Sequence, residues 1–164
     1  MKQLAAALLC CLMTLSLLGC RSADTGTVSF YYYRDPEQYQ YFESDSVIHA
    51  ESRDLVGHLG DLKYMVGLYL AGSMEEGMAI PFSRSTKLLS VQQTEGSILI
   101  ELSDHTKILT DSEFSLACAA LAMTCMDFTD CKDVTISSGN RSITLQTDDI
   151  ILSDNLPQQE TTGG

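Results

Sequence analysis

Apolar residues follow three different patterns in the first half of this chain. An uncharged run rich in Leu and Ala covers residues 4–18 and ends in Gly19-Cys20. Residues 28–33 are mostly β-branched or aromatic, which predicts a first strand. A polar loop follows to about residue 50, and from 51 to 71 the spacing becomes helical, with apolar residues at Leu55, Leu59, Leu62, Val66 and Leu70.

The second half alternates between short strands and one helix. Thr94-Glu95-Gly96 predicts a hairpin turn. The spacing of Thr110 and Glu113 matches a capping box, which predicts the start of a second helix. Its apolar face carries Phe114, Cys118, Leu121, Cys125 and Phe128, and its alanines let it lie deep against a sheet. Strands are predicted at 87–91, 98–102, 134–136 and 143–145, with 150–152 closing the core.

The predicted order is β-α-β-β-α-β-β. This order favours an α+β fold in which two helices pack on one face of a mixed sheet. The length of 164 residues fits one compact domain. We see no internal repeat.

The start of the chain has the features of a secretion signal. Lys2 precedes the apolar run, which is short for a membrane span and fits a signal peptide. Its end, Leu17-Leu18-Gly19-Cys20, resembles the lipobox of bacterial lipoproteins, in which the cysteine is acylated and becomes the new N-terminus. A plain signal peptide with an incidental cysteine is the alternative. The expected divisions are a signal peptide, a lipid-bearing cysteine with its tether, the folded domain and a disordered tail, at 1–19, 20–26, 27–152 and 153–164.

The net charge of the chain limits the classes of partner that it can bind. The formal net charge is −12, which opposes binding to nucleic acid and to anionic lipid headgroups. Attachment to a membrane would therefore have to be covalent or hydrophobic, as an acylated Cys20 provides. We expect a position on the outer face of the cytoplasmic membrane.

Three stretches stand in order along the folded part: YMVGLYLAGSMEEGMAIPFSRSTKLLSV, GSILIELSD and DSEFSLACAALAMTCMDFTDCKDVTISSGN. In this order they resemble the GerMN domain, the sporulation and spore-germination domain of secreted bacterial lipoproteins. Cys125 stands where a leucine is usual, and Met74 stands near a usual proline. The resemblance implies a module similar to ring-building domains of secretion assemblies. It also implies non-enzymatic work in assembling envelope or spore-associated proteins.

The residues give little support for catalysis or metal binding. Cys118 and Cys125 are too far apart on one helix to be bridged, whereas a Cys125–Cys131 disulfide is conceivable beside the favoured reading of three core thiols. The three histidines lack metal-ligand spacing, and His58 is expected at the edge of the core. The acidic residues near the end of the domain are expected on solvent-exposed faces rather than in a calcium site; they are Asp127, Asp130, Asp133, Asp148 and Asp149. No catalytic residue, cofactor or metal site is assigned.

Two hypotheses about function follow. The leading one is a protein-interaction module that contacts envelope or spore-assembly proteins through a sheet edge or helix face, with self-association left open. The alternative is a binding protein for an envelope glycan or peptidoglycan fragment, with Tyr39 and Tyr41 free to stack on the ligand. A structural explanation competes with this alternative: the tyrosines of this region would pack in the core and on the partly exposed face of a strand. An enzyme ranks third.

Overall fold

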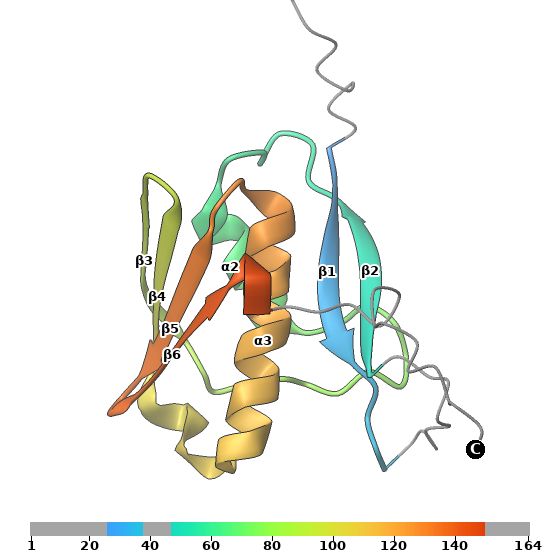
Figure 1. Ribbon diagram of the computed structural model, residues 1–164. Helices are drawn as coiled ribbons and strands as arrows, with labels where there is room; N and C mark the ends of the chain where they lie inside the picture. The colour runs from blue at the N-terminus through green and yellow to red at the C-terminus, as the bar shows by residue number, and fades with distance from the viewer. Residues whose placement is uncertain (1–25, 38–46, 150–164) are drawn as a thin grey trace, which may run out of the picture.

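The computed structural model describes residues 26–37 and 47–149. Its strands form two separate sheets (Figure 1). The smaller is an antiparallel pair of β1 (Thr27–Tyr33) and β2 (Ile48–Asp54). The larger is mixed, because its two central strands are parallel and its outer pairs antiparallel; in spatial order it holds β3 (Leu88–Thr94), β4 (Ser97–Leu102), β5 (Asp133–Ser138) and β6 (Arg141–Gln146).

Two α-helices, α2 (Leu62–Ala71) and α3 (Asp111–Phe128), complete the domain together with the 3₁₀ turns η1 (Asp104–Ile108) and η2 (Thr147–Asp149). α3 contacts β5 and β6 on one side and β1 on the other, so it lies between the two sheets (Figure 1). α2 contacts α3 and β3. The α+β class and the packing of both helices against one sheet are therefore confirmed.

The capping box at the start of α3 is also confirmed. The Thr110 hydroxyl accepts a hydrogen bond from the Glu113 amide at 3.3 Å, and the Glu113 carboxylate accepts one from the Thr110 amide at 2.7 Å. The face predicted to be apolar supplies the buried Phe114, Cys118, Leu121 and Cys125. Ala117, Ala120 and Ala122 are buried as well, which lets a helix fit between two sheets.

The long helix predicted over residues 51–71 is wrong at its N-terminal half. Residues 51–54 belong to β2, where Glu51 and Arg53 alternate inward. Gly57 and Gly60 then have φ of 86° and 85°, values outside the helical region, and the helix begins only at Leu62. The helical spacing of Leu55 and Leu59 was coincidental, because neither lies on a helix.

The sheet arrangement differs from the predicted one in a related way. Because β2 was missed, β1 was expected in the mixed sheet, but it pairs with β2 instead. The edge of β1 away from β2 is covered by α3. The Ser29 amide donates to the Asp127 carboxylate at 2.8 Å, and the Tyr31 amide donates to the Thr124 hydroxyl at 3.0 Å. The predicted closing strand at 150–152 lies outside the described residues.

Candidate functional site

The residues singled out from the sequence lie outside the described part of the chain. Cys20 precedes residue 26, and Tyr39 and Tyr41 fall between residues 37 and 47. Lipidation of Cys20 and ligand contact by the two tyrosines therefore stay predictions. The described residues show the surroundings in which they would act.

A cleft of about 410 Å³ lies beside the described residues on either side of positions 38–46. Glu37 and Val47, which flank that segment, both line the cleft. Its other lining residues combine an apolar set with a charged set: Tyr33, Pro36, Ala79, Ile80, Leu109 and Leu116, against Arg34, Asp35 and Glu113. Ala79 is held against the end of β1, since its amide donates to the Tyr33 carbonyl at 2.9 Å.

Glu113, one of the acids that line the cleft, has a shifted pKa. Hydrogen bonds from the Thr110 amide and hydroxyl lower the pKa of Glu113. The carboxylate is thus ionised at neutral pH, where it also completes the cap of α3. A lining that mixes apolar and charged side chains suits a ligand that has both apolar and polar parts.

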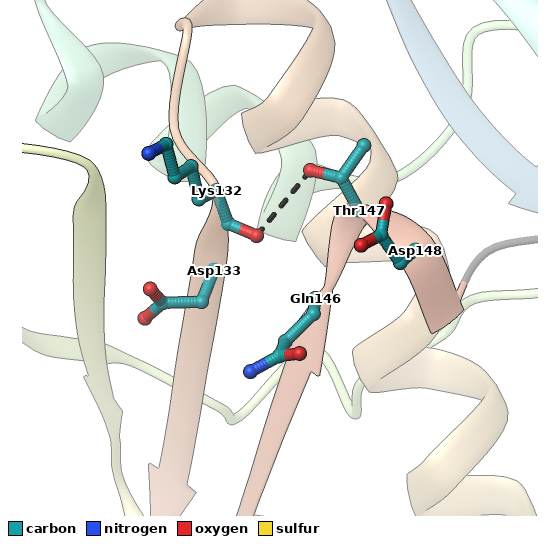
Figure 2. A pocket seen from close by; sticks show the side chains of 5 residues that line it. All are labelled: Lys132, Asp133, Gln146, Thr147 and Asp148. Atoms are coloured by element: carbon teal, nitrogen blue, oxygen red, sulfur yellow. Dashed lines mark hydrogen bonds between the residues drawn. The ribbon is translucent and has the colours of Figure 1, made fainter.

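A second, polar hollow lies where β5 begins and β6 ends (Figure 2). It measures about 550 Å³ and is lined by Lys132, Asp133, Gln146, Thr147 and Asp148. Some of its polar groups already form hydrogen bonds within the protein. The Thr147 hydroxyl donates to the Lys132 carbonyl at 3.3 Å, and the Asp133 carboxylate accepts from the Ser97 hydroxyl at 2.9 Å. Two of the polar groups that line the hollow are therefore occupied by bonds within the protein.

The strongest buried polar cluster connects β2 to the end of α2. Arg53 Nε donates to Glu51 Oε1 at 2.6 Å, and Arg53 Nη2 donates to the Gly72 carbonyl at 2.8 Å. Glu51 Oε2 accepts hydrogen bonds from the Ser73 hydroxyl and from the Met74 amide. The guanidinium also lies 4.5 Å from the centroid of the Phe30 ring. Each charged group is paired and makes several further hydrogen bonds, so this cluster is structural rather than reactive.

The pKa values of this cluster support that reading. Burial works to raise the pKa of Glu51, but hydrogen bonds from Arg53 and Ser73 outweigh it and leave that pKa below its ordinary value. Burial also raises the pKa of Tyr32 to about 12. Glu51 is therefore a permanent carboxylate and Tyr32 a permanent phenol at neutral pH, and neither is tuned for proton transfer.

Cys118, Cys125 and Cys131 are all free thiols. The Cys125–Cys131 disulfide considered above is not formed. Burial raises the pKa of Cys118 to about 12 and raises that of Cys125 further. Because the thiolate is the nucleophile, both buried thiols are inert at neutral pH.

The histidines do not converge. His49 pairs with Glu75 at 3.0 Å, and His105 lies 3.0 Å from the Ser103 hydroxyl. His58 is exposed rather than at the edge of the core, and its ring stacks on that of Tyr64 with centroids 3.7 Å apart. Within residues 26–37 and 47–149, no three metal-ligating side chains form a group suited to an ion. In the same residues no helix is long and apolar enough to cross a membrane.

Comparisons with known proteins add two structures. No protein-family model and no curated protein matches this chain. A candidate lipoprotein from Clostridium perfringens matches 75% of this chain and 88% of its own, with 16% identity and a TM-score of 0.48. The tandem GerMN domains of the sporulation protein GerM from Bacillus subtilis match 75% of this chain and 43% of their own, with 20% identity and a TM-score of 0.48. Scores and identities at this level leave the GerMN resemblance resting on the ordered sequence motifs.

Proposed function

We propose that this chain is a lipid-anchored lipoprotein outside the cytoplasmic membrane, and that its GerMN-like domain is a non-enzymatic protein-interaction module of the cell envelope or of sporulation and germination. The observation that carries the anchor is the apolar run that ends in Leu18-Gly19-Cys20. The described domain begins at Gly26, a short tether away from that cysteine.

The open face of the four-stranded sheet supports the interaction role. Ile98, Ile100 and Leu102 point into the core, so the alternate residues of β4 face away from the helices. Neighbouring strands place their own alternate residues on the same open face, among them Gln92, Thr135 and Thr144. Leu99 lies within this polar face and is 43% exposed.

The hydroxyl groups of this face bond to one another across the strands. Thr135 and Thr144 are 2.8 Å apart, and the Ser90 hydroxyl donates to Glu101 at 3.1 Å. A face whose polar groups are already paired costs less to desolvate than one with unpaired groups. An exposed leucine surrounded by such groups is suited to the centre of a protein contact.

The anchor is tested with a Cys20→Ser variant. Membrane fractionation and mass spectrometry of the mature N-terminus should show an acylated residue 20 in the parent protein and release of the variant from membranes. If the variant fractionates with membranes as the parent does, the anchor is wrong.

The interaction face is tested with Leu99→Glu. The lipidated protein is purified from envelopes under mild conditions, and co-purifying proteins are identified by mass spectrometry. Ile108→Glu is the matched control, because Ile108 is also exposed but lies in η1. Loss of a partner with Leu99→Glu alone supports the proposal. Retention of every partner by both variants contradicts this face.

The cleft beside residues 37 and 47 favours glycan binding as a second candidate function. Its lining mixes apolar and charged side chains and includes Glu37 and Val47, which flank in sequence the segment that holds Tyr39 and Tyr41. Aromatic rings stack on the apolar faces of sugars, while charged groups bond to hydroxyls. Tyr39→Ala together with Tyr41→Ala should abolish pull-down by peptidoglycan fragments and leave the protein partners bound. Unchanged pull-down would exclude this role for the tyrosines.

A further inference from the structure

The loop between β2 and α2 is built from two consecutive turns of the same design. The His58 amide donates to the Leu55 carbonyl at 2.8 Å, and the Asp61 amide donates to the His58 carbonyl at 3.0 Å. Gly57 and Gly60 occupy the third position of their turns with φ of 86° and 85°. A positive φ at that position is the signature of a type II turn, which glycine adopts without strain.

Each turn presents an apolar residue at its second position. Val56 and Leu59 occupy these positions and are 69% and 43% exposed. Turn tips ordinarily carry proline or polar residues, so two exposed aliphatic side chains in equivalent places need an explanation. The stacked rings of His58 and Tyr64 lie in the same region, and Tyr64 is also exposed. We call these four residues, Val56, His58, Leu59 and Tyr64, the turn-tip patch.

The patch lies where the chain enters the domain. The Leu55 amide donates to the Gly26 carbonyl at 2.7 Å, and a Cβ added to Gly26 would lie 2.6 Å from Val56 Cγ2. Five residues lie between Cys20 and Gly26, so the chain between these two residues can reach roughly 20 Å at most. Figure 1 shows the start of β1 and the β2–α2 loop at one end of the domain, with η1 at the opposite end.

We propose that the turn-tip patch rests in the surface of the lipid bilayer that holds the anchor. This inference depends on the proposed acylation of Cys20, because the short tether is what brings the patch to the membrane. Val56 and Leu59 would enter the boundary between headgroups and acyl chains. The ring of Tyr64 has the mixed character that favours this depth.

The charges around the patch are compatible with this occupant. Asp54 and Asp61 are the nearest acids in sequence, and each is already used as a cap, accepting from the Val56 amide and the Tyr64 amide at 2.9 Å. Lys63 is exposed beside Tyr64 and can pair with lipid phosphate. Asp127, whose carboxylate accepts from the Ser29 amide near the start of β1, lies at the same end of the domain (Figure 1), so the placement suits a zwitterionic surface better than an anionic one. The patch thus fixes which way the domain stands on its anchor.

The test places a fluorescent bimane label at residue 56 by Val56→Cys and at residue 108 by Ile108→Cys. Ile108 is 71% exposed, which matches Val56, and lies at the far end of the domain. Both variants also carry Cys131→Ser, since Cys131 is the half-buried thiol among the described cysteines. The lipidated proteins are reconstituted in phosphatidylcholine vesicles with lipids bearing a shallow doxyl quencher. We expect strong loss of emission at residue 56 and none at residue 108.

A second arm separates this inference from the anchor itself. The mature chain with Cys20→Ser and an N-terminal histidine tag is held on vesicles containing nickel-chelating lipid, and the same labels are read. Quenching at residue 56 in this arm supports the patch even if mass spectrometry shows no acyl group on the natural protein, in which case only the proposed anchor fails. Leu59→Cys repeats the measurement should Val56→Cys not fold.

Equal emission at residues 56 and 108 in both arms would overturn the proposal. So would a blue shift at residue 56 that depends on protein concentration and not on the quencher, because the occupant would then be a second copy of this chain.

Discussion

Arg53 and Glu51 form an ion pair of 2.6 Å between side chains that are each more than nine-tenths buried. They stand two apart on β2, so both point to the same side of the strand. The pair joins β2 to the carbonyls at the end of α2 and to the turn at Ser73 and Met74. It therefore fixes the position of α2 relative to the smaller sheet.

Replacing Arg53 with Met should destabilise the fold by about 3–5 kcal/mol, because Glu51 would be left buried without its partner. Urea denaturation measures the change. The double variant Glu51→Leu, Arg53→Met should regain part of the loss, since no unpaired charge remains. Lys107→Ala is the control: its pair with Asp104 is exposed and spans 3.5 Å, so its removal should cost at most about 0.5 kcal/mol. Equal effects of Arg53→Met and Lys107→Ala would refute the structural role of the pair.

Glu51 also predicts how stability depends on pH. Its pKa is lowered in the folded protein, so its contribution is present above the ordinary value of 4.5 and is lost as the pH falls through the folded value. The free energy of unfolding should therefore fall more steeply below pH 4.5 in the parent protein than in Glu51→Gln. Parallel acid curves for the two proteins would show that other carboxylates cause the decline.

The three described thiols should differ in reactivity. Cys118 and Cys125 are buried with raised pKa values, so both should resist alkylation by iodoacetamide at pH 8 in the native protein. Cys131 is half-buried and should react first. Peptide mass spectrometry after timed alkylation gives the order. Fast labelling of Cys118 would mean that α3 separates from the sheet in the native state.

Two glycine substitutions should have opposite signs. Gly57→Ala should destabilise the protein by about 1–2 kcal/mol, because its φ of 86° is costly for an L-residue even though the space is open. Gly67→Ala lies within α2, with nothing within 4 Å of the added Cβ, and should stabilise by about 0.5–1 kcal/mol. Thermal melts of both variants test the pair. A neutral or stabilising Gly57→Ala would show that turn geometry does not limit this loop, and a destabilising Gly67→Ala would contradict the expectation for α2.

The sequence predicted elements well where apolar patterning and local chemistry agree. The capping box at Thr110 gives the start of α3, and the alternation of Ile98, Ile100 and Leu102 gives the inward face of β4. Prediction failed at β2 because its inward positions are Glu51 and Arg53, two charged residues that give no apolar alternation in the sequence. They can be buried only because they form an ion pair with each other. The aliphatic spacing at Leu55 and Leu59 then suggested a helix where there are two turns.

The same reasoning explains what was missed at the surface. His58 was expected beside a helical stripe, but the stripe does not extend to Leu55 and Leu59, and the ring stacks on Tyr64 in the open. Turn chemistry at Gly57 and Gly60 was the available signal, since two glycines three apart interrupt a helix. The cleft near residues 37 and 47 could not be foreseen, because it depends on how the β1–β2 pair packs against α3.

Strand β1 is hydrogen-bonded along both edges, to β2 on one side and to Thr124 and Asp127 of α3 on the other. A mechanical load applied at Gly26 would run along β1 and strain these bonds together, in shear, rather than opening them one at a time. If the chain is tethered at its start, a pull on the domain would load β1 in this direction. The fold would then resist extraction at the point where the force enters.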